Sequence, residues 1–141
     1  RICRCGRSFS WRLDMAKALA LCPITGAERW GDVVLARKEV PTSYHLSVVM
    51  DDAAQGITHV VRGLDLEAST SVHRLLQKML GLNTPHYIHH RLVLDETGKR
   101  LAKSVKSTAL SALRADGMAP DDVRQLIGWH ERELDAYSLS V

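Results

Sequence analysis

The segment from Thr70 to Leu80 constrains the fold of this chain most strongly, because its apolar residues follow the period of an α-helix. These residues are Val72, Leu75, Leu76, Met79 and Leu80. They occupy positions i, i+3, i+4, i+7 and i+8, which form one apolar stripe along a helix. Thr70 or Ser71 can cap the start of the helix, and Gly81 can end it. We therefore expect an amphipathic helix with one buried face.

Short β-branched segments lie before and after this helix. Asp32 to Arg37 and Ile57 to Arg62 are bounded by turn-forming residues, which predicts two buried strands. Residues 41–53 place Leu46, Val49, Met50 and Ala53 at helical spacing, and Gly56 follows them. Tyr87 to Leu94 has an extended character. Because strands alternate with helices, we expect an α/β fold with some parallel sheet.

The remaining segments predict smaller elements at both ends of the chain. They are a strand at Phe9–Leu13, an alanine- and leucine-rich segment at Ala16–Leu21, a polar turn at Asp95–Lys99, a basic loop at Arg100–Ser107, short helices at Thr108–Ala115 and from Pro120 to Gly128, and a tail after Trp129. No internal repeat and no low-complexity tract is present in the sequence.

Composition limits the class of protein. The chain has 141 residues, 45% of them hydrophobic and 25% charged, with a net charge of +3, as in a soluble globular domain. No apolar run reaches the roughly 20 residues of a membrane-spanning helix, so we expect no membrane partner. The odd set of Cys3, Cys5 and Cys22, without an export signal, predicts reduced thiols in a cytoplasmic protein. Because residue 1 is Arg, we expect a piece of a longer protein.

The loop from Gly98 to Ser107 concentrates positive charge. It holds four cations, two serines and a glycine in ten residues. Lysine is a flexible point charge that suits a phosphate group, and this composition is also typical of a solvated basic loop. Charge alone leaves both interpretations open.

The amino-acid sequence of this loop also resembles a known motif. Leu94-Asp95, Gly98 and the run Arg100-Leu101-Ala102-Lys103-Ser104 resemble the KMSKS loop of class I aminoacyl-tRNA synthetases. The resemblance implies an ATP-binding loop in which Lys103 is catalytic and stabilises the pyrophosphate leaving group. Arg100 and Ala102 replace the first lysine and the first serine of the family pattern.

Longer motifs extend this resemblance over residues 12 to 128. They are Pro41-Thr42-Ser43-Tyr44-His45-Leu46, Val48-Val49-Met50-Asp51-Asp52, Gly56 to Leu66, Thr70, Leu75-Leu76, Leu80-Gly81-Leu82, Pro85 and Tyr87. Their order is similar to that of the glutamyl-tRNA synthetase family. This implies the C-terminal half of a Rossmann-like catalytic domain of class I, with short helices after the KMSKS-like loop. The implied domains are a connective or zinc-region remnant at 1–11, the catalytic half at 12–107, a helical segment contacting the tRNA stem at 108–128, and a tail at 129–141.

Within the resemblance, Tyr44 and Arg62 match the residues that bind glutamate. A guanidinium can grip a carboxylate with two hydrogen bonds, and a phenol can orient a polar ligand. Taken alone, each residue is more typical of an ordinary salt bridge or of the edge of a core. Gly63 and Asp65 follow in the same turn and are expected to support the pocket, although Asp65 is equally suited to capping that turn.

The resemblance implies a helix-end or structural role for Asp51 and Asp52. It is closest in wording to the glutamyl-queuosine branch, which carries a zinc site, so Cys3 and Cys5 are candidate remnants of a Zn²⁺ site that four ligands do not complete here. Cys22 is expected to be an inert thiol. His86, His89 and His90 suggest a metal at first sight, but neighbouring side chains in an extended segment point to opposite faces.

The implied reaction activates L-glutamate with ATP, accompanied by Mg²⁺, to give glutamyl-adenylate and pyrophosphate, and then passes the glutamyl group to queuosine in tRNA(Asp). The HIGH motif that completes such sites does not precede residue 12. We therefore expect the chain to act as part of a longer, monomeric ligase and to be inactive alone. The alternatives are a truncated glutamyl-tRNA synthetase that charges tRNA(Glu) and a non-catalytic tRNA-binding remnant.

Overall fold

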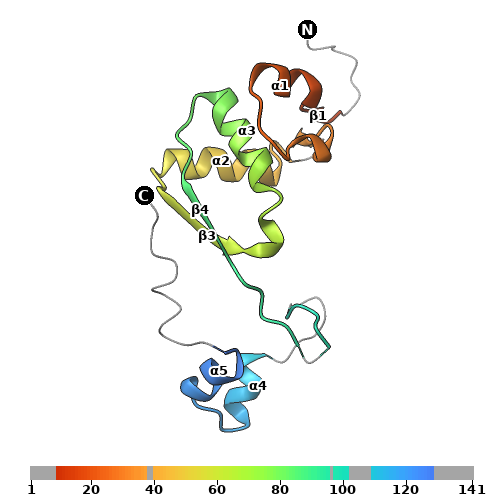
Figure 1. Ribbon diagram of the computed structural model, residues 1–141. Helices are drawn as coiled ribbons and strands as arrows, with labels where there is room; N and C mark the ends of the chain where they lie inside the picture. Colours follow the sequence, from red (N-terminus) through yellow and green to blue (C-terminus); the bar gives the residue numbers. More distant parts are fainter. Residues whose placement is uncertain (1–8, 38–39, 96, 102–108, 129–141) are drawn as a thin grey trace. The chain divides into compact units, whose positions relative to one another are not determined.

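The chain divides into two compact units, which are described separately. The computed structural model describes residues 9–37, 40–95, 97–101 and 109–128 (Figure 1). The first unit ends at Arg91 and the second begins at Leu92. In the described segments, no helix is long and apolar enough to cross a membrane. The predicted boundary between residues 107 and 108 remains a prediction, since it falls on residues outside the described ranges.

The first unit is centred on a β–α–β arrangement. Strand β3 (His59–Gly63) and strand β4 (His86–His90) pair in parallel, with Arg62 opposite His89, and helix α3 (Thr70–Leu80) connects them. A short 3-10 turn, η2 (Leu64–Leu66), follows β3 directly. This parallel pair confirms the predicted α/β fold. Side chains alternate across a strand, so Arg62 turns to the side of α3 while its neighbour Val61 stays 64% exposed.

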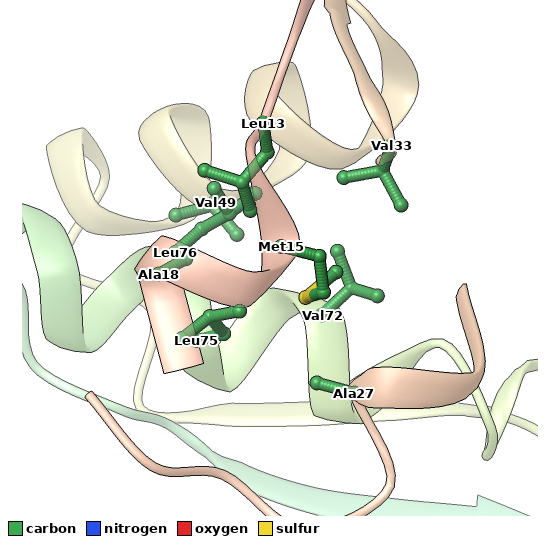
Figure 2. Close-up of a cluster of buried hydrophobic side chains, with 9 residues drawn as sticks. All are labelled: Leu13, Met15, Ala18, Ala27, Val33, Val49, Val72, Leu75 and Leu76. Atoms are coloured by element: carbon green, nitrogen blue, oxygen red, sulfur yellow. The ribbon is translucent and has the colours of Figure 1, made fainter. Parts of the chain in front are cut away.

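Helix α3 has the bounds predicted from its apolar stripe. Val72, Leu75 and Leu76 from that stripe are buried, and they pack with residues of helix α1 (Met15–Leu21) and helix α2 (Tyr44–Ala54) (Figure 2). The complete buried cluster is Leu13, Met15, Ala18, Ala27, Val33, Val49, Val72, Leu75 and Leu76. Figure 1 shows α2 beside α3, in agreement with the contacts between these helices. The apolar stripe therefore fixes where α3 lies.

The two ends of α3 differ in how well they were predicted. Gly81 ends the helix with φ at +67°, a left-handed conformation that glycine adopts without a Cβ clash, which confirms the prediction. The predicted caps Thr70 and Ser71 are wrong, because Ser69 occupies the N-cap position and makes no side-chain cap bond. Both predicted caps bond to other groups: Ser71 donates to backbone carbonyls, and Thr70 bonds to side chains of the strands.

A separate antiparallel pair precedes these elements. Strand β1 (Trp11–Arg12) pairs with strand β2 (Val34–Ala36), and the short turn η1 (Glu28–Trp30) lies between α1 and β2. The prediction that Asp32–Arg37 and Ile57–Arg62 are buried strands is wrong about burial. The residues of β2 are half-buried, and those of β3 are half-buried or exposed.

The second unit begins with a polar turn. Leu94 bridges to Arg100 in antiparallel fashion, and the Asp95 carboxylate accepts hydrogen bonds from Thr97 and from the backbone N–H of Lys99. These bonds lower the pKa of Asp95, with the Thr97 hydroxyl as the largest cause. Two short helices follow, α4 (Leu110–Ala115) and α5 (Pro120–Leu126), close to their predicted bounds.

We predict that Leu75→Ala lowers the free energy of unfolding by about 2–5 kcal/mol, because it opens a cavity beneath a side chain with no exposed surface. Urea denaturation of both proteins measures the change. Leu80→Ala is the matched control on the same helix. Leu80 is 48% exposed, so its truncation should change the free energy by less than about 1 kcal/mol. Equal losses for both variants would contradict the packing described for α3.

Candidate active site

Arg62 is held by three hydrogen-bond acceptors from two different elements. Its Nη1 donates to Nδ1 of His73 at 3.1 Å, its Nη2 donates to the hydroxyl of Thr70, and its Nε donates to Nε2 of His89 at 3.4 Å. Thr70 and His73 lie on one face of α3, and His89 lies opposite Arg62 on β4. The end of β3, the start of α3 and β4 thus meet at one guanidinium.

The bonds around Arg62 define the tautomers of its neighbours. Arginine only donates, so Nδ1 of His73 accepts and the proton of that ring is on Nε2. That Nε2–H donates to Nδ1 of His45 at 3.0 Å. Thr70 accepts from Arg62 and donates its own proton to Nε2 of His89 at 3.0 Å. Each imidazole in the cluster is therefore neutral.

Burial favours these neutral forms. His73 is 1% exposed, and desolvation, followed by the charge of Arg62, lowers its pKa to about 4. Desolvation and the charge of Arg62 also lower the pKa values of His45 and His89. Burial raises the pKa of Tyr87, whose ring lies 5.0 Å from the Arg62 guanidinium carbon. Arg62 is thus a cation among neutral groups.

This positive charge has no anionic partner within the described ranges. No carboxylate there lies within ion-pair distance of Arg62, and Glu67 and Asp52 act on the cluster only as more distant charges, on His89 and Tyr87. A guanidinium has five N–H groups, and Arg62 uses three of them, which leaves two. Two free donors and an uncompensated charge form a suitable site for a carboxylate.

Tyr44 lies at the start of α2, where the hydroxyl of Ser43 accepts a hydrogen bond from the backbone N–H of Leu46. The Tyr44 ring is 54% exposed and meets His45 and His73 edge-on, with ring centres 5.6 and 5.8 Å apart. The structure therefore brings the two predicted glutamate-binding residues, Tyr44 and Arg62, to the same imidazole. Their role in binding glutamate stays a prediction.

The positions of the other predicted residues say less about glutamate binding. Gly63 and Asp65 lie at the start of η2, directly after Arg62. Asp51 and Asp52 lie in the last turn of α2, where their backbone carbonyls accept from Gln55 and Ile57, in agreement with a helix-end role.

Arg100 and Leu101 are the first residues of the basic loop: Arg100 bridges to Leu94, and the Leu101 N–H donates to the Val93 carbonyl at 2.9 Å. The rest of the predicted KMSKS-like loop, Ala102, Lys103 and Ser104, lies outside the described residues. Its role therefore remains a prediction.

The metal site predicted at Cys3 and Cys5 remains a prediction. Cys3 and Cys5 fall outside the described ranges, and no group of three potential ligands is close enough to hold an ion among the residues inside them. His89 belongs to the Arg62 cluster, and His86 stacks on His59 with ring centres 5.1 Å apart.

Sequence reasoning missed most of the residues around Arg62. His45, His73, Gln77, Tyr87 and His89 line the cluster, and the Gln77 amide donates to the Tyr87 hydroxyl at 2.9 Å. A signal was present on α3, where Thr70, His73 and Gln77 form a second, polar stripe at helical spacing. Tyr87 and His89 add the two-residue period of a strand face.

Comparison with known proteins identifies the family of the chain. The family described as tRNA synthetases class I (E and Q), catalytic domain, matches residues 22–133. The glutamyl-Q tRNA(Asp) synthetase of Rhodobacter capsulatus is 58% identical over 106 residues, which are 75% of this chain and 38% of that protein. The enzyme of the same name from Synechococcus sp. is 44% identical over 100 residues, 71% of this chain and 33% of that protein.

Solved structures show the same fold. The glutamate tRNA ligase of Elizabethkingia meningosepticum, solved in complex with its amino acid, superposes with a TM-score of 0.50 at 28% identity, covering 69% of this chain and 19% of that one. The chain belongs to the class I tRNA synthetases of the E and Q family, within the catalytic domain. It spans about a third of the length of the curated relatives it matches.

We predict that the free energy of unfolding falls in mild acid, because His73 binds a proton more readily in the unfolded state than in the folded state. Its pKa is 6.5 without the fold and about 4 within it, so its contribution is complete above pH 6.5 and declines as the pH falls toward 4. Between pH 7 and pH 5 the free energy of unfolding should drop by about 2 kcal/mol from this group. Urea titrations across this range measure the slope. His73→Gln should flatten it, and an unchanged slope would contradict the assignment.

Proposed function

We propose that this chain supplies the glutamate-binding and phosphate-loop part of a ligase that activates L-glutamate with ATP and transfers it to tRNA. The observation that carries the proposal is Arg62, a cation that neutral acceptors orient and that no described carboxylate neutralises. Membership in the class I family and the names of the relatives support the same activity.

In the proposed reaction, one carboxylate of glutamate binds the free N–H groups of Arg62, and Tyr44 orients the substrate. The α-carboxylate oxygen attacks the α-phosphorus of ATP. A new acyl–phosphate bond forms, and the bond to pyrophosphate breaks. Lys103 then stabilises the charge of the departing pyrophosphate, a contribution of positioning and electrostatics. Mg²⁺ accompanies ATP as its counter-ion. The loop Arg100–Ser104 is the proposed ATP contact, and Gly63 with Asp65 supports the turn after Arg62.

The proposed acceptor is the queuosine base of tRNA(Asp). The curated relatives carry the name glutamyl-Q tRNA(Asp) synthetase, which supports this choice. The solved neighbours are titled glutamate tRNA ligase or synthetase, which favours charging of tRNA(Glu) as the second candidate. We place the complete enzyme in the cytoplasm with its tRNA and expect it to act as a monomer.

The acceptor prediction is that the complete enzyme transfers labelled glutamate to tRNA(Asp) that carries queuosine and leaves tRNA(Glu) unlabelled. Filter-bound radioactivity after incubation with ATP measures the transfer. The control is tRNA(Asp) from cells that cannot make queuosine, which should stay unlabelled. Labelling of tRNA(Glu) at the higher rate would select the second candidate and overturn the first.

The central prediction for Arg62 is that Arg62→Ala in the complete enzyme lowers kcat/KM for glutamate by about 10- to 100-fold, since a charged hydrogen-bonded contact is lost. Glutamate-dependent exchange of pyrophosphate into ATP measures this change. We expect the 141-residue chain alone to show only background exchange, because it spans a third of its relatives.

Arg74→Ala is the matched control for this experiment. It removes the same charge from the exposed side of α3, so the exchange should be unchanged. Equal exchange by Arg62→Ala and the unsubstituted enzyme would refute glutamate binding at Arg62.

A further inference from the structure

His73 is the group that joins the two proposed glutamate-binding residues. Its Nδ1 accepts from Arg62 at 3.1 Å, and its ring meets the Tyr44 ring at 5.8 Å. Its other nitrogen donates to His45, whose ring also packs edge-on against Tyr44. A shift of the His73 ring would therefore move both proposed ligands together.

The backbone that carries His73 is fixed by the neighbouring apolar face of α3. Val72, Leu75 and Leu76 of the same helix have almost no exposed surface and belong to the apolar core. Close packing of this kind resists rotation of the helix. The packing of the core thus fixes the position of His73, which is 1% exposed, and His73 in turn fixes the position of the Arg62 guanidinium through its hydrogen bond.

The chemical type of the acceptor also matters. A carboxylate at position 73 would orient Arg62 equally well but would cancel its charge through a close ion pair. Imidazole and hydroxyl acceptors orient the guanidinium and leave its charge intact. The other imidazoles of the network fit this pattern, since Nδ1 of His45 and Nε2 of His89 accept hydrogen bonds and both rings are neutral.

We infer that His73, with His45 as its hydrogen-bond acceptor, is a positioning residue that orients Arg62 and Tyr44 for glutamate while keeping Arg62 uncompensated, so that the substrate carboxylate is the anion that neutralises it. His89 has the same role from β4, as a second neutral acceptor. This inference rests on the proposed function of Arg62 as the glutamate-binding residue.

A matched pair of substitutions in the complete enzyme tests the inference. His73→Gln keeps a neutral acceptor and a donor, and His73→Glu has nearly the same shape but adds a negative charge beside Arg62. We expect His73→Gln to stay within about 3-fold of the parent in kcat/KM for glutamate. His73→Glu should raise KM for glutamate by about 10-fold or more while KM for ATP stays within about 2-fold.

The comparison of KM for glutamate with KM for ATP distinguishes a positioning role of His73 from a general structural role. A merely structural role would lower the activity of both variants and affect both substrates alike. Equal KM values for glutamate in the Gln and Glu variants would overturn the inference. If His73→Glu does not fold, judged by circular dichroism, the half-buried His89 replaces it. His89→Glu should then raise KM for glutamate relative to His89→Gln, and equality there overturns the inference as well.

Arg62→Ala in the same assay separates this inference from the proposed function. If Arg62→Ala leaves KM for glutamate unchanged, the proposed function fails first. If Arg62→Ala raises that KM while both His73 variants match the parent, the proposed function stands and the positioning role is wrong.

Discussion

The hydrogen bonds that hold the Arg62 guanidinium connect the fold of this chain to its chemistry. Thr70 and His73 come from α3 and His89 comes from β4, so the contact exists only when the parallel strand pair and the helix between them have formed. The apolar stripe of α3 provides the energy for that arrangement, since burial of apolar surface is the main favourable term in folding. Thr70 and His73, from the polar stripe of the same helix, then accept hydrogen bonds from Arg62 and orient its guanidinium.

Arg62 is half-buried, and a cation that is partly removed from water is costly unless another group compensates it, a role that a carboxylate usually fills. In the described part of this chain, Arg62 instead has imidazole, hydroxyl and aromatic neighbours. Such neighbours satisfy the geometry of the guanidinium without neutralising it. The site therefore gains most when an anion binds, which is the thermodynamic property that a glutamate site requires.

Much of the fold and part of the candidate site could be predicted from the sequence, and the predictions that failed did so for physical reasons. Helix α3 and its Gly81 end were predictable because apolar period and a left-handed glycine are local signals. The family resemblance singled out Arg62 and Tyr44. The role of His73 was not predicted, because a histidine on a helix becomes a partner of Arg62 only when that helix packs against the strand that carries the arginine. The Thr70 cap failed for the same reason, since its hydroxyl bonds across elements rather than along the helix.

The most direct test is a crystal structure of the complete enzyme with a non-reactive analogue of glutamyl-adenylate. The account predicts a carboxylate of the glutamyl moiety within hydrogen-bond distance of the Arg62 terminal nitrogens, roughly 3 Å. His73 should still accept from the same guanidinium. An analogue bound at full occupancy with its carboxylates on other residues, and with Arg62 joined only to its present neighbours, would contradict the account.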